Sequence, residues 1–251
     1  MSLRTKKNYW QQDFKKKEYI AAFLEGLGIM SVIGYLFYQS MIGILVLMPI
    51  SIWYVKKKKK MFEKKRQTMF KLQFREAIQA LLSALNVGYA MENAMREALK
   101  ELRLIYKKED MIIKEFEYMN HKIRMNLPAE EVWKAMAQKI DSEEVHNFVA
   151  VFVTAKRNGG DMLEILRSSI RQISEKIDVL NEIETLLAAK KLEFKIMTMI
   201  PMGIILYMRI SFPEFMNALY GTVMGAIVMS ACLIVYFAAY KLGEKIVEIE
   251  V

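Results

Sequence analysis

The residue types most used in catalysis and ligand binding are scarce in this chain, and their spacing matches no common site. Gly159 and Gly160 form its one glycine pair, and the carboxylate of Asp161 that follows them would repel a phosphate group. The sequence contains no Gly-x-x-x-x-Gly-Lys-Ser/Thr loop, no His-Glu-x-x-His motif and no serine nucleophile elbow. We therefore expect that the protein is not an enzyme, and that any ATP hydrolysis it depends on comes from a partner.

Cysteine and histidine are too few to build a metal centre. The single cysteine, Cys232, permits neither an internal disulfide nor a thiolate cluster. His121 and His146 are the two histidines, and we expect them at the surface or rim of the fold. The sequence therefore predicts no metal and no cofactor.

Two long apolar blocks are predicted to cross a membrane. Residues 19–55 contain one charged residue, Glu25, whereas a single helix needs only about 20 apolar residues to span a bilayer. This block is long enough for two short spans that turn near Gln39. Residues 193–240 form the second block, in which the segment 211–217, without Lys or Arg, separates two apolar runs. We predict four transmembrane helices in two hairpins.

Basic residues flank both blocks on each side, and they set the predicted topology. Cytoplasmic flanks collect Lys and Arg, so both ends of each hairpin are expected in the cytoplasm. A cleavable signal peptide fits the first block poorly, because the apolar run is too long and no small-residue cleavage site follows it. The predicted order is a basic cytoplasmic N-terminus (1–18), a hairpin (19–55), a basic juxtamembrane segment (56–66), a cytoplasmic helical domain (67–192), a second hairpin (193–240) and a cytoplasmic tail (241–251).

The net charge of +9 is concentrated beside the first hairpin. Residues 67–190 hold 18 Lys+Arg against 19 Asp+Glu, whereas residues 1–18 and 56–66 together carry a net charge of +11. A nucleic-acid-binding domain would need a basic patch on the folded part, so no nucleic acid partner is expected. The run Lys56, Lys57, Lys58, Lys59 and Lys60 is predicted to rest on anionic lipid headgroups, at about 1 kcal/mol per basic residue.

The segment between the two blocks is predicted to be an antiparallel bundle of about six helices, which makes the chain all-α. Its apolar residues recur three or four positions apart, as they do along one face of an amphipathic helix. Gly88 supplies a helix stop, Pro128 suits the first turn of a helix, and Phe148–Val153 should lie in the core. The expected helices cover residues 67–86, 91–102, 110–125, 128–140, 141–157 and 161 onward.

Three ionisable or small-residue features lie inside the apolar blocks. Glu25 is either an intramembrane coupling group or a carboxylate that snorkels or pairs with a lysine. Arg209 lies near the outer end of its predicted span, where snorkelling is expected. Gly221 and Gly225 match the small-residue packing motif of membrane helices, which fits close packing within the protein or a dimer face.

Three segments of the chain, in this order, resemble the F domain of type II secretion. They are Phe74–Met95, with its small residues and Gly88, then Arg157–Arg167, with the glycine pair, and Leu186–Pro201, which leads into the membrane. The likeness covers about residues 70–215. A single F domain between two transmembrane pairs looks like the TadB/TadC proteins of Flp (tight adherence) pilus assembly, and the sequence does not distinguish these two roles.

The resemblance implies a multi-pass inner-membrane platform protein. Its expected partners are a cytoplasmic secretion ATPase, a second F-domain platform protein and pilin or pseudopilin subunits, in a homo- or hetero-oligomer. The family position makes Arg157, Asn158, Gly159, Gly160 and Asp161 a candidate partner interface, although an ordinary helix–turn–helix corner explains the same residues. A small membrane transporter and a membrane-anchored signalling adaptor are the alternative functions.

Overall fold

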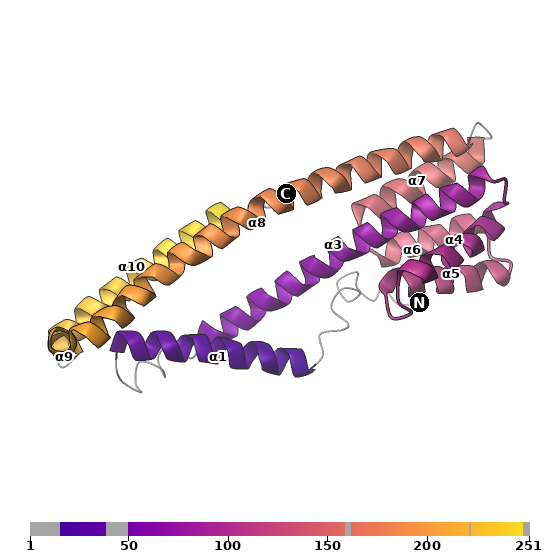
Figure 1. Ribbon diagram of the computed structural model, residues 1–251. Helices are drawn as coiled ribbons and strands as arrows, with labels where there is room; N and C mark the ends of the chain where they lie inside the picture. Colours follow the sequence, from indigo (N-terminus) through magenta and orange to yellow (C-terminus); the bar gives the residue numbers. More distant parts are fainter. Residues whose placement is uncertain (1–15, 39–49, 159–161, 221, 248–251) are drawn as a thin grey trace. The chain divides into compact units, whose positions relative to one another are not determined.

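A computed structural model describes residues 16–38, 50–158, 162–220 and 222–247, and every regular element in these ranges is an α-helix (Figure 1). The all-α prediction is thus confirmed. The helices are α1 (Lys16–Tyr38), α3 (Ile50–Asn86), α4 (Met91–Ile105), α5 (Met111–Arg124), α6 (Ala129–Lys139), α7 (Glu143–Asn158), α8 (Met162–Ser211), α9 (Pro213–Tyr220) and α10 (Val223–Val247).

The described residues divide into two compact units. The bundle unit comprises residues 61–179, and the span unit comprises residues 16–60 together with 180–247. Both boundaries fall inside a helix: one follows Lys60 in α3 and the other follows Val179 in α8.

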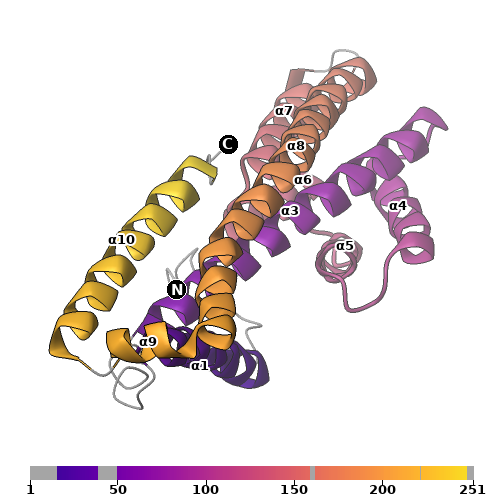
Figure 2. The ribbon, with the colours of Figure 1, turned by 60° about the vertical axis from the view of Figure 1, so that its left-hand side comes forward.

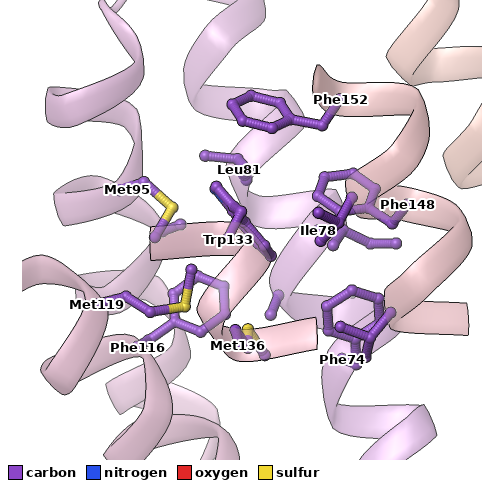
Figure 3. Close-up of a cluster of buried hydrophobic side chains, with 14 of the residues drawn as sticks. Phe74, Ile78, Leu81, Met95, Phe116, Met119, Trp133, Met136, Phe148 and Phe152 are labelled. Atoms are coloured by element: carbon purple, nitrogen blue, oxygen red, sulfur yellow. The ribbon is translucent and has the colours of Figure 1, made fainter. Parts of the chain in front are cut away.

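The bundle unit contains helices from six elements, as the sequence predicts: α4 to α7 and parts of α3 and α8. Its core centres on Trp133 of α6, which is fully buried among phenylalanine rings from α3, α5 and α7 (Figure 3). The nearest ring, that of Phe148, lies 5.0 Å away between centroids. Every expected inward position of α4 is buried: Met91, Ala94, Met95, Ala98, Leu99 and Leu102.

Local chemistry explains where the bundle helices begin and end. After α3 the backbone of Gly88 has a φ of +94°, and its N–H donates to Leu85 while Tyr89 donates to Ala84. These two hydrogen bonds form a Schellman motif, which favours glycine at this position. Pro128, predicted in the first turn of a helix, is instead the N-cap of α6, one position before the helix begins, with a φ of −58°.

Some predicted boundaries and burials were wrong. Helix α3 begins at Ile50, not near residue 67, because the lysine-rich segment that precedes the bundle continues the same helix. On α7, Ala150 is exposed and Val151 is half-buried, so the Phe148–Val153 run is not wholly in the core. The helical period of 3.6 residues turns these two side chains away from the rings of Phe148 and Phe152.

Three helices are long and apolar enough to cross a membrane, judged on the residues that the structure describes. The candidate segments are Tyr19–Tyr38, Leu163–Ser211 and Val223–Val247. The predicted fourth span, about residues 40–55, falls largely on residues 39–49, outside the described ranges. The four-span, two-hairpin arrangement therefore stays a prediction.

The second predicted hairpin has a helical turn region. Segment 211–217, predicted as a loop, is largely taken up by the short helix α9, which lies across the ends of α8 and α10 (Figure 2). Pro201 lies within α8 without ending it. Gly225 packs so closely on the backbone of Leu219 that an added Cβ would overlap it, which places the glycine of the predicted packing motif at an intramolecular contact. The other glycine, Gly221, lies outside the described residues.

This close approach predicts an unequal response to alanine at two glycines. Gly225→Ala should lower the free energy of unfolding of the full chain in detergent by about 1–3 kcal/mol, because backbone atoms of Leu219 must move. Gly203→Ala is the matched control, since nothing lies within 4 Å of a Cβ added there. Thermal unfolding followed by circular dichroism measures both, and equal midpoints for the two variants would contradict the close contact.

Candidate interaction surfaces

The basic run of α3 contains two lysines that pair with carboxylates of the span unit. Lys57 forms an ion pair with Glu244 of α10, and Lys58 forms one with Glu25 of α1. Successive residues of a helix point about 100° apart, so two neighbouring lysines reach two different helices. We call Glu25, Lys57, Lys58 and Glu244 the ionic junction. For Glu25, the structure has the lysine pair that the sequence left as one alternative.

Aromatic packing reinforces the ionic junction. The ammonium of Lys57 lies 5.7 Å from the ring centroid of Tyr240, and this ring lies 5.7 Å from that of Phe194 on α8. Gly243 packs directly against the Phe194 ring, because a Cβ there would overlap it. Helices α1, α3, α8 and α10 therefore meet at one end of the span unit.

Arg209 lies at the other end of the span unit, two residues before α8 ends. Its Nη2 donates a hydrogen bond of 2.9 Å to the hydroxyl of Tyr35 on α1. Its guanidinium carbon also lies 4.4 Å from the centroid of the Tyr35 ring, within cation–π distance. The predicted snorkelling of Arg209 is not tested by these contacts.

The predicted partner interface Arg157–Asp161 falls mostly outside the described residues. Helix α7 ends at Asn158 and α8 begins at Met162, and the three residues between them are not described. Two contacts involve described residues near the ends of α7 and α8. Arg167 of α8 donates to Asn86 at the end of α3 over 3.1 Å, and Lys156 of α7 lies 3.7 Å from Glu130 of α6. Ends of α3, α6, α7 and α8 therefore gather at one end of the bundle.

This end of the bundle exposes apolar side chains that the sequence reasoning missed. Tyr89 follows the α3 turn, and Met125 and Leu127 occupy the turn between α5 and α6. The exposed fractions are 77% for Val87, 45% for Tyr89, 61% for Met125, 37% for Leu127 and 41% for Ile165. We call these five residues the turn surface. Apolar residues at predicted helix ends were the available signal, because a turn in water is usually polar.

A second feature missed by sequence reasoning is a buried carboxylate, that of Glu144 on α7. Its side chain is 1% exposed, and the hydroxyl of Ser142 donates to it over 2.6 Å. Lys71 of α3 lies 2.9 Å from it and Lys176 of α8 3.8 Å, so Glu144 links three helices. An acidic residue in the first turn of a helix is ordinary, and no local pattern reveals that this one is buried.

The pKa of Glu144 reflects two opposing effects. Burial raises the pKa of this carboxyl, but the hydrogen bonds from Ser142 and Lys71 favour the charged form and outweigh it, so the pKa lies below its ordinary value. A group whose pKa is lowered on folding stabilises the fold above its unfolded pKa and loses this contribution as the pH falls through the folded value.

The lowered pKa of Glu144 predicts how the stability of the fold depends on pH. The contribution of Glu144 should be complete above about pH 4.5, the ordinary value of the group, and should disappear at lower pH. Glu144→Gln should cost about 1–3 kcal/mol at neutral pH and flatten the acid side of the stability profile. Glu143→Gln is the matched control: that exposed neighbour pairs with Lys176 over 2.8 Å, and its loss should cost below about 1 kcal/mol. Equal losses for both variants, measured by denaturant unfolding, would contradict this role.

The described residues contain no cluster that could bind a metal ion. No three side chains of His, Cys, Asp and Glu gather there as metal ligands would. His121 and His146 are both exposed, as expected, and the ring Nδ1 of His146 lies 2.8 Å from the carbonyl oxygen of Ser142.

The described residues form an all-helical protein with three helices that are long and apolar enough to cross a membrane. A family model, type II secretion system (T2SS), protein F, matches residues 77–209. The match covers more than half of the chain, and the chain therefore belongs to the T2SS protein F family. No curated protein and no solved structure matches the chain significantly.

Membership confirms the resemblance to the F domain and sets the broad role. Proteins of this family are membrane platform proteins, generally not enzymes, that work in secretion or pilus machines with ATPases and other platform proteins. The candidate spans and the family together indicate an inner-membrane protein. The match begins in α3 and ends at Arg209, so α1, α9 and α10 lie outside it.

Proposed function

We propose that the protein is an inner-membrane platform (scaffold) protein of a Flp-type pilus assembly or related secretion machine, with a TadB- or TadC-like role. The bundle unit faces the cytoplasm and binds the secretion ATPase, while the spans contact pilin or pseudopilin subunits and a second platform protein. Both termini are cytoplasmic, and four spans form two hairpins. The observation that carries this proposal is the family match to residues 77–209 together with the apolar helices beside it.

Helix continuity supports a role in coupling. The boundaries between the bundle unit and the span unit lie inside α3 and α8, so the chain stays helical at both crossings. A packed helix can transmit displacement where a flexible linker would not. In α8 no glycine or proline occurs between Met162 and Pro201, so the helix has no weak point over that length. Displacement of the bundle unit by the ATPase would thus reach the spans.

The turn surface and the neighbouring corner, Arg157–Asp161, are the proposed ATPase contact. Support comes from exposure, since apolar side chains that are 37–77% exposed contribute little to folding and suit a partner interface. The basic run Lys56–Lys60 is proposed to lie at the cytoplasmic headgroups. The ionic junction supports this position, because it joins α3 to predicted cytoplasmic ends of α1 and α10.

The test is retention of the cognate ATPase by the tagged full-length protein in detergent. Val87→Asp should weaken retention about tenfold or more, since it places a charge on the most exposed apolar residue of the proposed contact. Leu104→Asp is the matched control, because Leu104 is 88% exposed at the other end of α4. Failure of the unaltered protein to retain the ATPase would remove the coupling mechanism. Equal retention by both variants would remove only the assignment of the turn surface.

Topology and the alternative functions have separate tests. A cysteine introduced in place of Ser40 or Asn217 should be labelled only from outside the cell. A cysteine in place of Gly160 should be labelled only from the cytoplasm. A transporter usually has discontinuous spans, and the continuity of α8 through Pro201 weighs against that alternative. Substrate flux in liposomes would favour a transporter, and the absence of neighbouring pilus genes would favour a signalling adaptor.

A further inference from the structure

Arg209 carries a positive charge that no carboxylate balances within the described residues. Its interactions are the hydrogen bond to the Tyr35 hydroxyl, 2.9 Å long, and the contact with the Tyr35 ring at 4.4 Å, and both involve a neutral group. The nearest acidic residue in the sequence, Glu214 of α9, is exposed and does not pair with it. A guanidinium stays charged at any relevant pH, so at a membrane it needs water or an anion.

The surroundings of Arg209 have the character of a membrane interface. Helix α1 ends at Tyr38 and α8 ends at Ser211, so Tyr35 and Arg209 both lie within one turn of a helix end. The residues around Arg209 in the sequence, at the end of α8 and the start of α9, include large, mostly apolar and exposed side chains: Tyr207 is 62% exposed, Ile210 73%, Phe212 52% and Phe215 59%. Tyrosine rings such as those of Tyr35 and Tyr207 are enriched at the headgroup level of a bilayer.

Two further tyrosine hydroxyls at this end of the span unit are already engaged by the protein. The Tyr38 hydroxyl lies 2.8 Å from that of Ser230, and the Tyr220 hydroxyl donates to the carbonyl oxygen of Leu36. Tyr35 accepts one hydrogen bond from the five N–H groups of Arg209 and holds the guanidinium plane against its ring. The remaining N–H groups are therefore positioned donors for an oxyanion.

We infer that Arg209 and Tyr35 form a binding site for the phosphate group of a phospholipid at this membrane interface. The planar guanidinium matches phosphate oxygens in a two-pronged hydrogen bond, and the exposed apolar faces of α8 and α9 accommodate the acyl chains. An acidic side chain of a protein partner is the other anion of suitable geometry. The lipid is favoured because the exposed side chains that neighbour Arg209 in the sequence, Tyr207, Ile210 and Phe212, are large and mostly apolar.

The experiment measures lipids retained by the purified full-length chain in a neutral detergent, by native mass spectrometry. Phosphatidylglycerol is titrated against diacylglycerol, which has the same acyl chains without the phosphate. The unaltered protein should retain phosphatidylglycerol selectively. Arg209→Gln should weaken the tightest phosphatidylglycerol site about tenfold, and Tyr35→Phe, which removes the hydroxyl that positions the guanidinium, about threefold. Arg171→Gln, which alters an exposed arginine of α8 in the bundle unit, is the control and should change nothing.

Three results would overturn the inference. One is equal retention of diacylglycerol and phosphatidylglycerol by the unaltered protein. Another is unchanged phosphatidylglycerol retention by Arg209→Gln. If that variant does not fold, unchanged retention by both Arg209→Lys and Tyr35→Phe would overturn the inference in its place. The third is a photo-crosslinker at position 209 that captures an acidic segment of a protein partner in membranes and no lipid.

Discussion

Replacing Trp133 by alanine should lower the free energy of unfolding of the bundle unit by about 3–5 kcal/mol. The indole is fully buried, and four phenylalanine rings surround it with centroids 5.0–6.5 Å away: Phe74, Phe116, Phe148 and Phe152. These rings come from α3, α5 and α7, so the cavity left by alanine would border three helices (Figure 3). Denaturant unfolding of the full chain in detergent, followed by circular dichroism, measures the loss.

Two variants make this result interpretable. Trp133→Phe should cost less than about 1.5 kcal/mol, because most of the ring volume is kept and the indole Nε1 has no hydrogen-bond partner to lose. Tyr118→Ala removes an aromatic residue that is 50% exposed on α5 and should change stability little. A loss from Tyr118→Ala as large as that from Trp133→Ala would show that the described core is not what stabilises the bundle.

Reversing the charge of Lys58 should disrupt the span unit, and reversing Glu25 as well should restore it. Lys58→Glu places two carboxylates together beside a predicted membrane segment, whereas Glu25→Lys with Lys58→Glu re-forms the ion pair in the opposite sense. The double-mutant cycle should give a coupling energy of about 1–2 kcal/mol. The proposed function predicts the same pattern for filament assembly in cells, with loss in the single variant and recovery in the double variant.

Lys56→Glu separates an ion-pair role from a headgroup role. It changes the net charge of the basic run by the same amount as Lys58→Glu, but in the described structure the carboxylate of Glu25 pairs with Lys58. Lys56→Glu should weaken the affinity of the basic run for anionic membranes by about 1 kcal/mol, the value for one headgroup contact. Equal damage from Lys56→Glu and Lys58→Glu, without rescue by Glu25→Lys, would mean that total positive charge is what matters.

Features set by neighbouring residues were the ones that the sequence predicted well. The buried face of α4 follows from apolar spacing alone, and the turn after α3 follows from Gly88, whose positive φ few other residues tolerate. Helix type and helix ends depend on such short-range physics. The extension of α3 back to Ile50 was missed because a run of lysines has no apolar period, although lysine is a good helix former.

Features that depend on distant contacts were not predictable. No residue near Glu144 in the sequence indicates that Lys71 and Lys176 will lie close to its carboxylate. The ionic junction joins Lys58 to a residue 33 positions away, and α3 could have presented either lysine to either acid. The turn surface was overlooked because its members come from three separate parts of the chain: the turn between α3 and α4, the turn between α5 and α6, and the start of α8. Only the folded bundle brings them together.

The ion pair between Lys57 and Glu244 bears on how the chain is made. Glu244 leaves the ribosome 187 residues after Lys57, which at ordinary rates of synthesis is a delay of roughly 10–40 s. During that interval the ammonium of Lys57 lacks this partner. A chain truncated before α10 would lack both this carboxylate and the Tyr240 ring, so an unfinished molecule differs from a complete one at the ionic junction.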